Sequence, residues 1–133
     1  MNPHYPQVAE RAQRRCEYCH APEEVFNFAF EVEHPLPQSR GGSDVLDNLA
    51  LSCHACNRFK SDFLTGFDPV TGHEVPLFNP RRDRWAEHFR IDPETLEMIG
   101  LSPVGRATIT RLQMNRLRHI NARIRWMQLG LFP

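Results

Sequence analysis

The chain has 133 residues, 11 of them proline, and its 16 basic and 16 acidic side chains give a formal net charge of zero. This length fits one small domain with a limited core, which a structural metal would help to stabilise. No apolar run could serve as a signal or cross a membrane, so we expect a cytoplasmic protein with reduced thiols and no membrane partner.

The charges are unevenly distributed along the chain. Six arginines and no acidic residue follow Met98, whereas all 16 acidic residues and 10 basic ones precede it. The C-terminal end therefore carries a charge of about +6 and the rest about −6. Such an end suits a polyanionic partner, although a solvated helix face would produce the same pattern.

The first half of the chain predicts a helix, two strands and a second helix. Residues 1–15 are polar and helix-prone, and residues 25–32 are rich in β-forming side chains that alternate in part. Pro35 and Pro37 should end that strand, because proline cannot donate to a strand ladder. A loop with Gly41 and Gly42 follows, then a short apolar strand at 49–51 and a helix at 54–62.

Residues 65–133 look like an extension to this first part. Residues 68–72 predict a turn, and residues 87–91 and 95–99 could pair as a hairpin. Ser102 followed by Pro103 resembles the start of a helix. Beyond it we expect one amphipathic helix whose apolar stripe packs on the rest of the protein. The apolar stripe is Leu117, Ile120, Ile124 and Met127, and the basic stripe is Arg111, Arg118 and Arg125.

The four cysteines form two Cys-x-x-Cys pairs, Cys16 with Cys19 and Cys53 with Cys56. Two such knuckles complete a four-cysteine zinc site, which would be closed and therefore structural. Disulfides would need an oxidising compartment, and a thioredoxin-like redox pair would need a βαβ unit. Cys-x-x-Cys-His at 16–20 also matches a haem-attachment pattern, but the second pair argues against it. Any catalytic chemistry must then lie elsewhere.

Between and after the knuckles lie Glu33-His34, Gly41-Gly42, Asn48-Leu49 and the run Cys53-His-Ala-Cys-Asn-Arg-Phe-Lys60. This order and spacing resemble the HNH endonuclease family, and the resemblance covers about residues 14–62. It implies a small ββα-metal core. With the extension at 65–133, the whole chain is then expected to be a single α+β domain, 1–133, with a hairpin and a basic helix at its C-terminal end.

The resemblance also implies roles for individual residues. His34 corresponds to the general base, Glu33 and Asn57 to the ligands of a catalytic Mg²⁺ or Mn²⁺, and Asn48 to the residue that orients the base. The expected substrate is DNA, as a duplex. Side chains that could meet its phosphates are Arg40, Arg58, Lys60, Arg111, Arg118 and Arg125.

Two features leave alternatives open. Glu33 stands where Asp is more frequent, and neighbours on an ideal strand point to opposite faces, so Glu33 and His34 can share a site only where the strand distorts. A non-catalytic zinc module that binds nucleic acid, or an adaptor with a decayed site, would keep the cysteines and arginines. Neither would need Glu33, His34 and Asn57 together.

Overall fold

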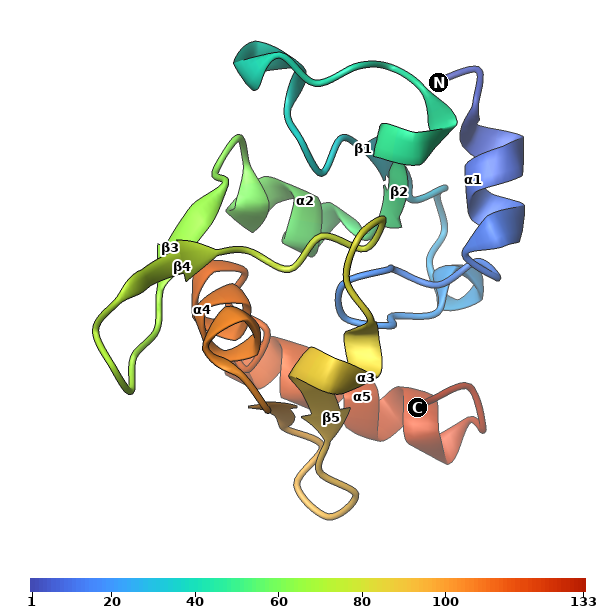
Figure 1. Ribbon diagram of the computed structural model, residues 1–133. Helices are drawn as coiled ribbons and strands as arrows, with labels where there is room; N and C mark the ends of the chain where they lie inside the picture. Colours follow the sequence, from blue (N-terminus) through green and yellow to red (C-terminus); the bar gives the residue numbers. More distant parts are fainter.

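The computed structural model describes all residues from Met1 to Pro133 (Figure 1). Its six strands pair as three separate antiparallel two-stranded sheets, which confirms an α+β architecture of short elements. None of the helices has the length and apolarity needed to cross a bilayer. The helices are α1 (Tyr5–Arg11), α2 (His54–Lys60), α3 (Trp85–His88), α4 (Pro103–Arg111) and α5 (Leu117–Gln128). The strands are β1 (Glu31–Glu33), β2 (Ala50–Ser52), β3 (Thr65–Phe67), β4 (Glu74–Pro76), β5 (Phe89–Ile91) and β6 (Met98–Gly100).

The β1–β2 sheet is shorter than the sequence predicted. Only residues 31–33 pair, with Glu33 opposite Ala50 as the last pair of the ladder. Residues 23–25 form a 3₁₀ turn instead, and Glu23 Oε2 accepts the backbone N–H of Phe30 at 2.7 Å. A side chain thus satisfies a backbone group that the predicted strand would have paired.

Helix α2 follows β2 directly and carries the second knuckle. The Sγ of Cys53 caps its start by accepting from the N–H of Cys56 at 3.5 Å. The helix ends at Lys60, two residues earlier than predicted, because Ser61 adopts a positive φ of 51°. This places residues 53–60 beside β1 in the upper part of Figure 1.

The hairpin and the helix start predicted in the extension are both present. Strands β5 and β6 pair with Ile91 opposite Met98, and the carboxylate of Asp92 closes the turn by accepting two backbone N–H groups. Ser102 Oγ accepts the N–H of Gly105 at 3.0 Å, with Pro103 in the first turn. Local turn and capping chemistry is sufficient to form both features.

The single amphipathic helix predicted near the C-terminus was wrong. A turn at residues 112–116 separates α4 from α5, so Arg111 ends one helix while Arg118 and Arg125 lie on the next. The predicted apolar stripe faces solvent, and Leu117 is 72% exposed. The buried face carries Arg123 and Trp126, and Arg123 donates to the backbone carbonyls of Leu96 and Met114. Because these hydrogen bonds satisfy donors of the Arg123 guanidinium, the side chain can be buried on a helix face that the periodicity predicted to be polar.

Candidate active site and zinc centre

The four cysteines converge on one buried point although the two pairs are far apart in sequence. All are free thiols, and their sulfurs lie within 4.8 Å of one another. Cys19 Sγ and Cys53 Sγ are 3.7 Å apart. Four sulfurs at about 2.3 Å from a tetrahedral zinc ion would lie about 3.8 Å from each other. The cluster therefore fits a zinc ion.

The four thiols also influence one another's ionisation. Hydrogen bonding to Cys16, Cys19 and Cys53, together with burial, raises the pKa of the Cys56 thiol well above its usual range. Zinc binds thiolates, and its charge offsets the repulsion between them. Because four protein sulfurs fill a tetrahedral shell, the ion would be structural.

His34 lies just past the end of β1, where the backbone has left the ladder. Its Nε2 lies 3.0 Å from Oδ1 of Asp44, and its side chain is 18% exposed. The hydrogen bond to His34 is the main reason that the pKa of Asp44 is lowered from its ordinary value. Asp44 is therefore an ionised acceptor at neutral pH, able to hold the imidazole with its proton on Nε2.

Asn48 makes backbone contacts across the loop that follows His34. Its Oδ1 accepts the N–H of Leu36 at 3.0 Å, and its Nδ2 donates to the carbonyls of Leu36 and Ser43 at 2.9 Å. Gly42 packs against the same loop with no room for a side chain, since a Cβ at this position would lie 1.8 Å from the Leu36 carbonyl oxygen. The Gly41-Gly42 and Asn48-Leu49 motifs thus belong to one closed loop, which also contains Asp44.

Glu33 is buried and held by two partners. Tyr18 donates its hydroxyl to Oε2 at 2.6 Å, and Lys60 Nζ lies 2.7 Å from Oε1. Lys60 is itself only 2% exposed and also donates to the carbonyl of Pro35 at 3.2 Å. Lys60 was predicted to meet DNA phosphates, but in this structure its ammonium lies against the buried carboxylate of Glu33 instead.

Replacing Lys60 with Met should destabilise the folded protein by about 3–5 kcal/mol, because Glu33 would keep a buried charge without its counter-ion. We would measure this by urea unfolding of the zinc-loaded protein. Arg58 is exposed on the same helix, so Arg58→Met is the matched control and should change stability by less than about 0.5 kcal/mol. Adding Glu33→Gln to Lys60→Met should restore much of the loss. Equal stability of Lys60→Met and wild type would contradict the proposed charge compensation.

Asn57 lies one turn into α2 and faces β1. Its Nδ2 donates to Oε2 of Glu31, whose Oε1 lies 3.0 Å from Nδ1 of His54. Glu31 was not among the site residues predicted from the sequence. Glu31 and Glu33 are two residues apart in the strand, which places both side chains on one face. This spacing was the sequence signal that could have identified Glu31. No comparable signal pointed to Asp44.

Glu33, His34 and Asn57 line one pocket of about 250 Å³, together with Val32, Pro37, Gln38 and Ser61. The three residues come from the end of β1, the segment after it and the middle of α2. The neighbours Glu33 and His34 can both reach this pocket because the strand pairing stops at Glu33. The four cysteines remain the only set of three or more His, Cys, Asp or Glu side chains near enough to share a metal.

Comparison with known families found one match. Residues 16–63 match the family model described as HNH endonuclease. This segment is similar to HNH endonuclease domains, and we refer to it as the HNH domain. The match begins at Cys16 and ends just after α2, so it includes both knuckles and the loop of His34. Comparisons with curated proteins and with solved structures found no match.

The arginines that were predicted to contact nucleic acid differ in their solvent exposure. Arg58, Arg118 and Arg125 are exposed. Arg40 is also exposed, and its Nε donates to the carbonyl of Asp62 at 2.7 Å. Arg111 is half-buried with its guanidinium 3.8 Å from the ring centroid of Phe63, so part of its surface is already used.

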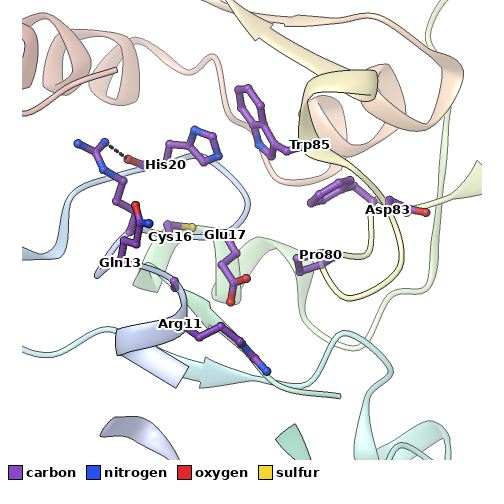
Figure 2. A pocket seen from close by; sticks show the side chains of 11 residues that line it. Arg11, Gln13, Cys16, Glu17, His20, Pro80, Asp83 and Trp85 are labelled. Atoms are coloured by element: carbon purple, nitrogen blue, oxygen red, sulfur yellow. Dashed lines mark hydrogen bonds between the residues drawn. The ribbon is translucent and has the colours of Figure 1, made fainter. Parts of the chain in front are cut away.

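A separate hollow of about 330 Å³ lies between the first knuckle of the HNH domain and the extension (Figure 2). Trp85 stacks on His20 at a centroid distance of 3.9 Å, and its Nε1 donates to the carbonyl of Tyr18 at 2.8 Å. None of the predicted catalytic residues lines this hollow. Its contacts attach the extension to the zinc-binding knuckle.

Proposed function

We propose that the protein is a metal-dependent endonuclease that hydrolyses DNA phosphodiester bonds, with His34 as the general base. The HNH domain indicates nuclease activity in general. The finer assignment is carried by one observation, which is that His34, Glu33 and Asn57 line the same pocket. The zinc-binding cluster is closed and buried, so it cannot supply the reacting centre.

His34 is suited to take a proton from water. Asp44 accepts a hydrogen bond from Nε2, which leaves Nδ1 as the unprotonated nitrogen of the neutral ring. A base oriented in this way by a carboxylate is suited to abstract a proton from water. Asn48 closes the loop around this pair through its contacts with Leu36, so its role is to position the base.

Glu33 and Asn57 are the residues that would hold the divalent ion. Asn57 donates through Nδ2 to Glu31, which leaves Oδ1 as a hard oxygen ligand. Glu33 already binds Tyr18 and Lys60, but a carboxylate offers about four acceptor positions. Oxygen ligands without imidazole suit Mg²⁺ or Mn²⁺, which would stabilise negative charge on the phosphate and on the leaving oxygen.

The exposed arginines Arg40, Arg58, Arg118 and Arg125 are proposed to bind the phosphate backbone. Such contacts fix the register of the nucleic acid and weaken as salt rises. Arg58 lies on α2 next to Asn57, which makes it the arginine best placed to meet the phosphates that flank the reacting one.

Zinc-loaded protein should nick DNA only when Mg²⁺ or Mn²⁺ is added. The assay would follow supercoiled plasmid and circular single-stranded DNA, with either ion or with no added divalent ion, so that the structural zinc is not removed by a chelator. A His34→Ala preparation purified in the same way controls for contaminating nucleases. Absence of cleavage by folded wild type with either ion and both substrates would favour a non-catalytic nucleic-acid-binding module.

A further inference from the structure

A third cavity, of about 330 Å³, lies where the segment after the first 3₁₀ turn, the start of α2 and helix α5 meet. Its volume is at the lower end of the range of about 300–1,000 Å³ found for small-molecule sites. Neither the zinc cluster nor the proposed catalytic pocket explains it. Among the residues that line it are Phe26, Phe28, His54, Arg116, Arg118 and Trp126.

The walls of this cavity are aromatic. Phe28 is 55% exposed, and its ring contacts that of Phe26 edge-to-face with centroids 6.1 Å apart. Phe26 in turn packs against Trp126, with centroids 6.1 Å apart. The rings are thus supported from behind while Phe28 keeps an uncovered face, which is the condition for stacking a flat ligand.

The charged side chains that line the cavity are both basic, Arg116 and Arg118. One carboxylate lies beside them, that of Glu31, whose Oε1 is 3.0 Å from Nδ1 of the lining residue His54. Burial, followed by the nearby Arg123 and Arg116, lowers the pKa of His119 to about 3, so this lining residue stays neutral at pH 7. A flat aromatic group joined to an anionic backbone matches this combination of walls and charges.

The cavity also adjoins the proposed catalytic pocket. His54 lines the cavity and Asn57 lines the catalytic pocket, three residues apart on α2, and both contact Glu31. Three helical residues span about 4.5 Å along the axis. The cavity and the catalytic pocket are therefore near enough to contact neighbouring nucleotides of one strand.

We propose that this cavity binds an unstacked nucleobase of single-stranded DNA, with Phe28 as the stacking platform and Arg118 on the adjoining phosphate. The proposal rests on the proposed nuclease function and refines its substrate. Bases inside a duplex have both faces covered by their neighbours, so only an unpaired or extruded base can enter. The site thereby favours single-stranded DNA, or unpaired stretches within a duplex, over the regular duplex expected from the sequence.

The test measures binding in the absence of cleavage. A fluorescein-labelled 12-nucleotide oligothymidylate and a regular duplex of equal length are titrated with zinc-loaded protein, without added divalent ion, and anisotropy is followed. Wild type should bind the single strand more tightly than the duplex. Phe28→Ala should weaken single-strand binding by at least about fivefold, as expected for loss of one stacked base.

The matched control is Phe67→Ala, because Phe67 on β3 is 58% exposed and lies outside the cavity. Its single-strand affinity should stay within about twofold of wild type. Thermal midpoints equal to wild type would establish that both variants fold. Equal affinity of Phe28→Ala and Phe67→Ala for the single strand would overturn the proposal, and so would a wild type that binds the duplex at least as tightly.

The nicking assay separates this result from the nuclease function. If wild type cleaves with Mg²⁺ but Phe28→Ala binds like wild type, the base site is wrong and the nuclease remains. If Phe28→Ala loses single-strand affinity while wild type never cleaves, the base site remains and the nuclease is wrong.

Discussion

Cys56→Ser is expected to yield a protein without zinc and without stable tertiary structure. Cys56 is fully buried, and its sulfur is one of four in the cluster. Structural zinc contributes about 10–16 kcal/mol in zinc-finger peptides, whereas whole domains of this size are stable by only about 5–15 kcal/mol. Losing one ligand should therefore remove most of the margin that keeps the chain folded.

The measurement is zinc content per chain by mass spectrometry of metals, together with near-ultraviolet circular dichroism. Ser52→Ala is the matched control, since Ser52 is buried beside the knuckle and its hydroxyl donates to the carbonyl of Cys53 at 3.0 Å. That variant should keep one zinc and lose about 1 kcal/mol of stability. A Cys56→Ser protein with wild-type dichroism and no zinc would show that the core folds without metal.

His34→Ala should reduce the rate of DNA cleavage by about 10² to 10⁴-fold, the usual contribution of a general base, while DNA affinity stays unchanged. The loss follows from removing the only imidazole in the proposed catalytic pocket. His34 lies beyond the last strand pair, so truncating it should leave β1 and α2 in place.

Single-turnover cleavage with saturating Mg²⁺ measures this rate directly. His73→Ala is the control, because His73 lies exposed in the turn between β3 and β4 and should leave the rate as in wild type. Asp44→Asn should fall between the two, since it weakens the hydrogen bond that holds the tautomer. Cleavage by His34→Ala at the wild-type rate would mean that another group is the base.

Much of the zinc-binding part was predictable because its signals are local. Two Cys-x-x-Cys knuckles specify a metal site whatever lies between them, and Ser102 with Pro103 specifies a helix start. Strand β2 and helix α2 are adjacent in the chain, so the local residue pattern was sufficient to predict both. The β5–β6 hairpin was also predictable, although β5 begins two residues later and β6 three residues later than expected.

The candidate site could be predicted only in outline. His34, Glu33 and Asn57 were singled out by a resemblance and line one pocket, but their partners were not visible in the sequence. Asp44 reaches His34 across ten residues of loop, and Tyr18 reaches Glu33 from the first knuckle. Such contacts depend on how the loop closes, and no periodicity encodes that.

The sequence by itself determined the four-cysteine cluster that fits zinc, the α+β class and the resemblance of residues 16–63 to HNH endonucleases, because each depends on residue types at short fixed spacing. Tertiary structure alone decided which faces are covered. Lys60 is buried against Glu33, and α5 buries Arg123 while it exposes Leu117. Periodicity shows which side chains share a face, but only packing decides which face meets solvent, and a buried charge is tolerated only where a distant partner reaches it.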